Sequence, residues 1–151
     1  MRILLDTNIL ARATPGPSSL SRDLVRLASL PPHVLILSPF LLSELSRVLG
    51  YERMRRVHGL DDVAVREHLL NLQATALLVD PPAAGNLSVP HDPDDNPVIA
   101  AAVAGQAEVL CTLDRHLWHP NVLAFCGQYG IRVRTDVELM GELRAAGPRE
   151  P

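Results

Sequence analysis

The sequence predicts an α/β protein with a mainly parallel sheet, because short apolar runs alternate with segments whose apolar residues recur at helical spacing. Of the 151 residues, 47% are hydrophobic and 21% are charged, which is enough apolar material for one packed core. Prolines and glycines separate the segments, as expected for connections at the surface. We therefore expect a single domain over residues 1–146, followed by a frayed tail over residues 147–151.

In the first half of the chain, the predicted strands are Ile3–Leu5 and His33–Leu37, both fully apolar or nearly so. The first of them stops at Asp6-Thr7-Asn8, which predicts a turn. Ser38 followed by Pro39 is typical of a helix start, with a capping hydroxyl and a proline at the first helical position. The helices expected in this half are Leu20–Ala28, Pro39–Leu49 and Asp62–Leu77. The residues from Tyr51 to Arg56 either continue a helix or turn, and Leu77-Leu78-Val79 either end a helix or form a short strand.

In the second half, the segment Pro81–Asp94 is rich in proline and acids and predicts a loop. Asn96-Pro97 predicts an N-cap for a helix that is apolar on all sides, runs through Ala104 and ends at Gly105. A buried strand follows at Glu108–Thr112. The last predicted elements are an edge strand at Ile131–Arg134 and a closing helix that starts with the capping box Thr135-Asp-Val-Glu138.

Composition excludes several classes of protein. The chain has no apolar run of about 18 residues, and Asp6 comes too early for the core of a signal peptide, so we expect a cytoplasmic protein without a membrane helix. Cys111 and Cys126 are too few for a disulfide framework or a thiolate metal site. Aromatic residues make up 3%, too few for an extended base-stacking surface. All 14 basic residues are Arg, which suits phosphate contacts but also follows from coding bias.

Three acids are candidates for one site. Asp6 and Asp114 come just after predicted parallel strands, whose carboxyl ends are the usual place for ligands in an open sheet. Each could instead be an ordinary cap or turn residue. Glu44 falls in the apolar sector of its predicted helix, between Leu41 and Leu45, where a lone carboxylate is costly. A salt bridge to an arginine is the alternative to a bound cation at Glu44.

The densest acidic segment is His91-Asp92-Pro93-Asp94-Asp95-Asn96, directly before the apolar helix. Carboxylates that converge without enough basic partners repel one another, and a hard divalent cation such as Mg²⁺ or Mn²⁺ is the usual remedy. Two such ions about 4 Å apart can support phosphodiester hydrolysis. A solvated acidic loop is the alternative explanation of the segment. Zinc is less favoured, because His116 and His119 lack a third ligand of clear spacing.

Four segments together resemble a PIN domain, and more narrowly the VapC-related toxins of type II toxin–antitoxin systems. These segments cover most of the chain: LLDTNIL (4–10), SPFLLSELSRVL (38–49), DPDDNPVIAAA (92–102) and LCTLDRHL (110–117). The resemblance implies a three-layer α/β/α fold with strand order 3-2-1-4-5 and Mg²⁺- or Mn²⁺-dependent ribonuclease activity. Relatives usually carry a glycine where this chain has Leu113.

The resemblance also assigns residues and partners. The metal-binding and catalytic acids would be Asp6, Glu44, Asp95 and Asp114, with Asp92 and Asp94 as alternatives for the third acid. The supporting residues would be Asn8, Asp92, Asn96 and Thr112. Phosphate contacts to RNA are expected from Arg47, Arg53, Arg55, Arg56 and Arg115, for each of which a solvated helix end is the alternative. The implied partners are an RNA substrate, a cognate antitoxin and a second copy of the chain.

Two other functions compete with a ribonuclease. One is a phosphatase with Asp6 as a covalent nucleophile, although Asn8 stands where the D-x-D-x-T pattern requires a second acid. The other is a non-catalytic module that binds RNA or a protein partner, in which the acids are caps and solubilising charges.

Overall fold

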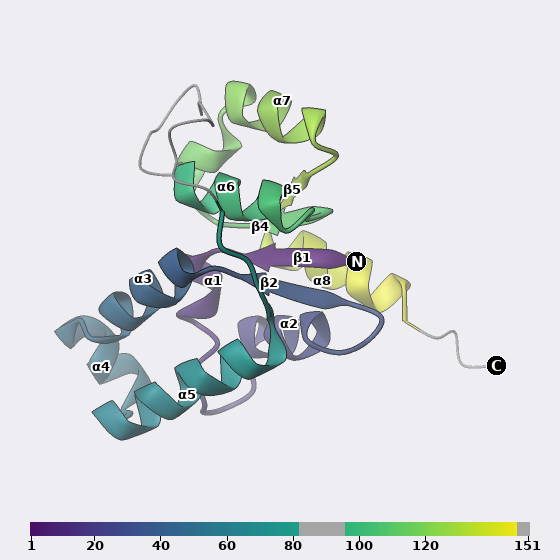
Figure 1. Cartoon of the computed structure of the whole chain (residues 1–151). Coiled ribbons are helices and arrows are strands. Elements are labelled where there is room, and N and C mark those ends of the chain that lie inside the picture. The colour runs from purple at the N-terminus through teal and green to yellow at the C-terminus, as the bar shows by residue number, and fades with distance from the viewer. Residues whose placement is uncertain (82–95, 148–151) are drawn as a thin grey trace.

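The computed structural model describes residues 1–81 and 96–147. In these residues five parallel strands form one sheet with the order β3-β2-β1-β4-β5 (Figure 1). The strands are β1 (Arg2–Leu5), β2 (Val34–Leu37), β3 (Leu77–Leu78), β4 (Val109–Cys111) and β5 (Arg132–Arg134). The expected fold class and strand order are thus confirmed, and β5 is an edge strand as predicted.

The central strands are in register and send alternate side chains to opposite faces of the sheet. Ile3 of β1 pairs with Leu35 of β2 and with Val109 of β4, and all three belong to one hydrophobic cluster. Leu4, the next residue of β1, belongs to the cluster on the other face. Both faces are therefore buried, which is why these strands are apolar throughout rather than alternating.

Helices cover both faces and make the fold three-layered (Figure 1). One cluster is built on α2 (Leu20–Ala28), α3 (Pro39–Leu49), α5 (Asp62–Thr75) and α8 (Asp136–Ala145). The opposite cluster is built on α6 (Asn96–Ala104) and α7 (Pro120–Gln128). None of the helices in the described ranges has the length and apolar character that crossing a bilayer requires.

Side-chain caps set several helix starts, and those at Ser38 and Thr135 were predicted from the sequence. The hydroxyl oxygens of Ser19 and Ser38 accept hydrogen bonds from backbone N–H groups at the starts of α2 and α3. Thr135 and Glu138 form the complete capping box of α8. These caps supply hydrogen-bond acceptors to the first backbone N–H groups of each helix, which have no acceptor within the helix.

Gly105, predicted as the end of α6, is required by a close approach between elements. A Cβ atom at position 105 would lie 2.7 Å from Cγ2 of the fully buried Ile36 on β2. Five consecutive residues of α6, 98–102, are buried, in agreement with a helix that is apolar on all sides. The missing side chain thus lets this helix lie close to the sheet.

Several elements differ from their predictions. The expected turn after β1 is the short helix α1 (Thr7–Leu10), which Asp6 caps through its side chain. The residues after Tyr51 form a separate helix, α4 (Glu52–His58), and α5 ends two residues earlier than predicted, so that Leu77 and Leu78 form β3. Helix α6 starts at Asn96, one residue before its predicted first position.

The segment between β4 and β5 contains two elements that the sequence analysis did not predict. These are the 3-10 helix η3 (Arg115–Trp118) and α7. Pro120 at the start of α7 and the His119 side chain, which accepts from the backbone N–H of Asn121, mark this start. Helix α7 was not predicted because its apolar periodicity is weak: Val122 and Cys126 are the only buried residues of this helix.

Candidate active site

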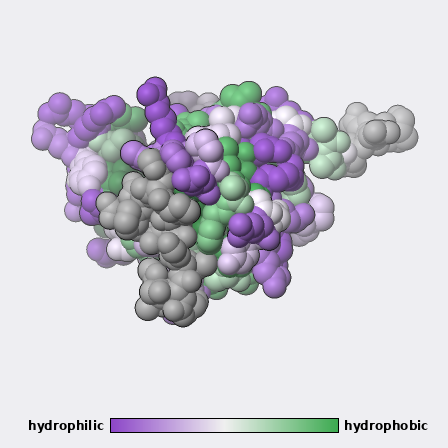
Figure 2. Space-filling model, turned by 90° about the horizontal axis from the view of Figure 1, so that it is seen from above, coloured by the Kyte–Doolittle hydropathy of each residue, from purple (hydrophilic) through white to green (hydrophobic). Residues whose placement is uncertain are grey.

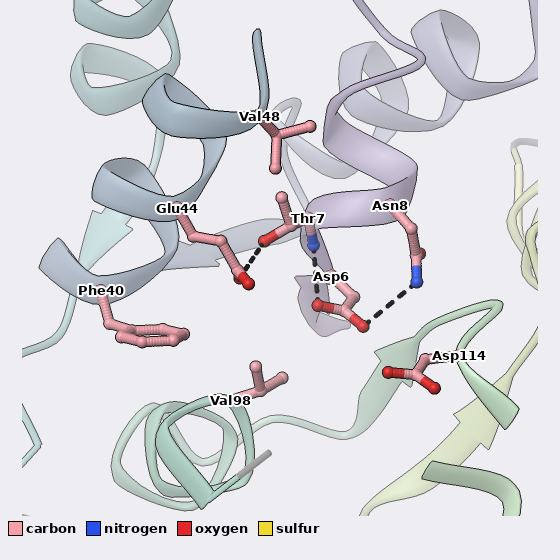
Figure 3. A pocket seen from close by; sticks show the side chains of 8 residues that line it. All are labelled: Asp6, Thr7, Asn8, Phe40, Glu44, Val48, Val98 and Asp114. Carbon is pink, nitrogen blue, oxygen red and sulfur yellow. Dashed lines mark hydrogen bonds between the residues drawn. The ribbon is translucent and has the colours of Figure 1, made fainter. Parts of the chain in front are cut away.

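A cavity of about 250 Å³ opens at the carboxyl edge of the sheet, where β1 and β4 end side by side (Figure 3). Three acids from distant parts of the sequence line it: Asp6 after β1, Glu44 on α3 and Asp114 after β4. The backbone N–H of Asp6 donates to the carbonyl oxygen of Cys111 at 2.9 Å, which extends the β1–β4 ladder to the cavity. Parallel pairing is therefore what brings two of the acids to one place.

Asp6 is buried and held from both of its oxygens. Asp6 is only 6% exposed. Its Oδ1 accepts from the backbone N–H of Thr7 at 2.8 Å, and its Oδ2 accepts from the Thr112 hydroxyl at 2.7 Å and from the Asn8 amide at 3.4 Å. All three donors are neutral, so the carboxylate is fixed in position without being neutralised.

Thr112 is the centre of the polar network. It is fully buried, and its hydroxyl donates to Asp6 while it accepts from the backbone N–H of Asp114 at 3.0 Å and from the Asn8 amide at 3.4 Å. The Asn8 carbonyl oxygen in turn accepts from the backbone N–H of Leu113 at 3.3 Å. Thr112 and Asn8 thus tie the end of β4 to the start of α1, next to the acids.

Glu44 reaches the cavity from α3 and is held more loosely. One of its oxygens accepts from the Thr7 hydroxyl at 2.6 Å, and the other lies 3.7 Å from the guanidinium of Arg47. The Glu44 side chain is 27% exposed and that of Arg47 is 62% exposed. An ion pair so long and so open contributes little, so the alternative of a structural salt bridge accounts for only part of this position.

Asp114 lies at the entrance of η3. Its Oδ1 accepts from the backbone N–H of His116 at 3.0 Å, which makes it the cap of that helix. Asp114 is therefore a helix cap, which was the alternative considered for it from the sequence. Its carboxylate also lines the cavity together with Asp6 and Glu44. A cap of this kind uses one oxygen and leaves the other for a further contact.

The electrostatics of the cavity favour an added positive charge. Burial raises the pKa of Asp6 above its ordinary value, and the charges of Glu44 and Asp114 raise it further. The hydrogen bonds from Thr112 and Thr7 act in the opposite direction but do not outweigh burial. A raised carboxyl pKa means that the ionised form is disfavoured in the protein, which a nearby cation would relieve.

The described residues that line the cavity fit a hard cation in donor chemistry, because they include three carboxylates and neither a thiolate nor an imidazole. Within residues 1–81 and 96–147, however, no three His, Cys, Asp or Glu side chains gather closely enough to form a metal cluster by themselves. Asp92, Asp94 and Asp95 lie outside the described residues, as does the side chain of Asn96. The described part of the site therefore supplies three facing carboxylates, not a closed ligand set.

The predicted phosphate contacts do not line this cavity. Arg47 is the nearest to it through Glu44, and it also donates to the Tyr51 hydroxyl at 2.8 Å. Arg55 pairs with Asp62 at 2.8 Å and lines a second cavity between α3 and α5, while Arg56 pairs with Glu52. Arg53 and Arg115 are exposed, Arg115 directly after Asp114. Of the arginines predicted to contact RNA phosphates, Arg47 and Arg115 are thus the two that lie close in sequence to an acid of the cavity, Arg47 to Glu44 and Arg115 to Asp114.

Four cavity residues were missing from the sequence prediction: Thr7, Phe40, Val48 and Val98. Thr7 had a usable signal, since it lies next to Asp6 and hydroxyl donors commonly orient carboxylates. Phe40 and Val48 share the helical face of Glu44, four residues before it and four after it, which the spacing alone could have indicated. Val98 had no such signal, because its neighbours in the sequence are equally apolar.

Comparison with known proteins agrees with this architecture. The model of the PIN domain family matches residues 2–116. One chain of the crystal structure of VapBC2 from Rickettsia felis, bound to a DNA fragment from their promoter, superposes with a TM-score of 0.55. That match has 15% sequence identity and covers 89% of this chain and 98% of the other, so it shows a shared fold. No curated protein matches the sequence. The match over residues 2–116 is more than half of the chain, and the protein belongs to the PIN domain family.

Proposed function

We propose that this protein is an endoribonuclease that depends on Mg²⁺ or Mn²⁺ and hydrolyses RNA phosphodiester bonds. The observation that carries the proposal is the shared cavity of Asp6, Glu44 and Asp114, three carboxylates from separate elements at the carboxyl edge of a parallel sheet. Membership of the PIN domain family supports it. A divalent ion bound there would supply an activated water and charge stabilisation for the leaving oxygen.

The protein's own residues would hold and orient that ion. Asp6, Glu44 and Asp114 would be its described ligands, with Asp95, or Asp92 or Asp94 in its place, as the proposed fourth acid. Thr112 and Asn8 fix the Asp6 carboxylate, and the Thr7 hydroxyl fixes one oxygen of Glu44. Because these donors are neutral, they orient the carboxylates toward the cavity without occupying it with a cation of their own.

The substitution Asp6→Asn tests the proposal. We expect it to abolish RNA cleavage in Mg²⁺ or Mn²⁺, because it removes the most buried carboxylate of the cavity. The circular dichroism spectrum should be unchanged. Glu67→Gln is the matched control, since it also removes one carboxylate but from an exposed position of α5 outside the cavity. Cleavage by Asp6→Asn at the rate of the parent protein, in preparations free of contaminating nuclease, would reject the assignment.

Metal titration distinguishes the ribonuclease from a non-catalytic module. Millimolar Mn²⁺ should raise the melting temperature of the parent protein and of Glu67→Gln, and it should not raise that of Asp6→Asn. An unchanged melting temperature in all three proteins would favour the module. A phosphatase is less consistent with the site, because Asn8, which donates to Asp6, stands where such an enzyme requires a second acid; a phosphoaspartate trapped at Asp6 would revive it.

The proposed biological context is a toxin–antitoxin pair with this chain as the toxin. The fold likeness to a chain of VapBC2 supports this context. A cognate antitoxin would then insert a segment near the cavity and place an arginine against the acids, and the toxin would form a homodimer. Inhibition of cleavage by a co-expressed candidate antitoxin, and a dimer mass in solution, are the measurements that test these two partners.

A further inference from the structure

One side of the acid cavity is apolar, and its largest exposed group is the ring of Phe40. In Figure 3 Phe40 and Val98 lie on one side of the cavity, and Asn8 and Asp114 lie on the other. Phe40 is 40% exposed, whereas its neighbour Leu41 is fully buried. An aromatic ring is thus presented to solvent at the edge of a site whose other members are mostly acids and amides.

The ring is not needed to attach α3 to the rest of the protein. Leu41, Leu45 and Leu49 form the buried side of this helix and are fully inaccessible. Among the described residues, Phe40 belongs to neither of the two hydrophobic clusters. The exposed part of the ring can therefore contact a ligand without disturbing the packing of the core.

The spacing of Phe40 and Glu44 links the ring to the proposed chemistry. The two residues are four positions apart on α3, so their Cβ atoms are about 5–6 Å from each other on one helix face. A phosphate held at the acids would have its flanking nucleotides within reach of a group at this distance. An unpaired base stacks on an aromatic ring whatever its identity, because every base has a π-face.

We propose that Phe40 is the stacking platform for one unpaired base next to the cleaved phosphate, and that it sets substrate affinity rather than the rate of hydrolysis. This inference rests on the proposed ribonuclease function and deepens it. Val98 lies on the same side of the cavity as the ring (Figure 3) and is itself buried, so that a base stacked on Phe40 meets a second apolar side chain there. Phe40 is a positioning residue in this scheme, because it holds a part of the substrate that does not react.

The experiment combines substitutions of Phe40 with RNA oligonucleotides that carry one abasic nucleotide, moved stepwise along the strand. Phe40→Leu keeps an apolar side chain without the ring, and Phe40→Trp keeps a ring. Tyr129→Leu is the control, because Tyr129 is 49% exposed and lies in a different hollow, with Gln106 and Ile131. Phe40→Leu should raise KM on the order of 10-fold with kcat nearly unchanged, since one base-aromatic stack contributes about 1–3 kcal/mol.

The abasic scan then shows whether ring and base act together. At one position beside the cleaved bond, the missing base should raise KM of the parent protein and of Phe40→Trp to the value of Phe40→Leu, and leave Phe40→Leu unaffected. Tyr129→Leu should behave like the parent protein throughout. Equal abasic effects on the parent protein and Phe40→Leu at every position would overturn the proposal, as would a loss in kcat alone.

Failure of this inference is distinguishable from failure of the proposed function. A parent protein that cleaves RNA but shows no coupling between Phe40 and any base refutes only the role of Phe40. A parent protein that cleaves no RNA in Mg²⁺ or Mn²⁺ refutes the proposed function. In that case, fluorescence anisotropy with the same labelled oligonucleotides still measures the coupling, and equal affinities of the parent protein and Phe40→Leu would refute the platform as well.

Discussion

Two carboxylates of this protein, the buried Asp6 and the partly exposed Glu142, are held in opposite ways. Asp6 accepts hydrogen bonds from Thr7, Thr112 and Asn8, all neutral, and it faces two further acids across the cavity. Glu142 on α8 accepts from Arg132 at 2.8 Å and from Arg134 at 2.7 Å, both on β5. One carboxylate is left with its charge uncompensated, and the other is paired twice.

The two environments shift the pKa in opposite directions. Burial raises the pKa of Asp6. Burial also acts to raise the pKa of Glu142, but the hydrogen bonds and charges of Arg134 and Arg132 outweigh it and hold that pKa below its ordinary value. The comparison teaches that Glu142 stabilises the docking of α8 on the edge strand, whereas Asp6 costs stability in the metal-free protein. An uncompensated acid of this kind is typical of a binding site.

The largest effect on stability is expected from Thr112→Val, which removes the hydroxyl at the centre of the Asp6 network. The change keeps the shape of the side chain but leaves Asp6 Oδ2 without its shortest hydrogen bond and the backbone N–H of Asp114 without its acceptor. We expect a loss of about 2 kcal/mol in the free energy of unfolding, measured by urea titration.

Thr112→Ser is the control for that prediction, because it keeps the hydroxyl and should retain most of the stability. If Thr112→Val is as stable as the parent protein, the network does not hold Asp6, and the contrast with Glu142 loses its structural basis.

A smaller effect, of opposite sign at the two positions, is expected when each carboxylate is replaced by its amide. In metal-free buffer at neutral pH, Asp6→Asn should raise the free energy of unfolding, because it removes the cost of burying a charge and also the repulsion from Glu44 and Asp114. Glu142→Gln should lower the free energy of unfolding by about 1 kcal/mol, because it removes two partly exposed ion pairs, one with Arg132 and one with Arg134. Equal signs in chemical denaturation would contradict the comparison.

The smallest effect is the pH dependence of the Glu142 contribution. Its pKa is lowered in the folded protein, so the folded state binds fewer protons and the stabilisation is complete above the unfolded value of 4.5. It is lost as the pH falls through the lower, folded pKa. The difference in urea midpoint between the parent protein and Glu142→Gln should therefore shrink from neutral pH to about pH 3. A difference that grows on acidification would reverse the assigned sign.

The site was only partly predictable from sequence. The expected positions of Asp6 and Glu44 could be argued because one follows an apolar strand and the other interrupts an apolar helix face. Thr7 was interpreted as part of a turn, yet it starts α1 and its hydroxyl contacts Glu44, 37 positions away. The contact depends on how α1 and α3 lie against each other, which no local pattern records. The pairing of Glu142 with β5 escaped prediction for the same reason.

Local patterns determined where most of the strands and helices form, because periodicity, caps and prolines act over a few neighbouring residues. They determined the strands β1, β2 and β4, the start of α3 and the capping box of α8. Only the tertiary structure decided which side chains meet, since the Thr112 hydroxyl reaches Asp6 across 106 positions of chain through the parallel pairing of β1 and β4. It also decided that Phe40 faces the acids and that Arg55 does not, because both outcomes depend on how helices pack around the sheet.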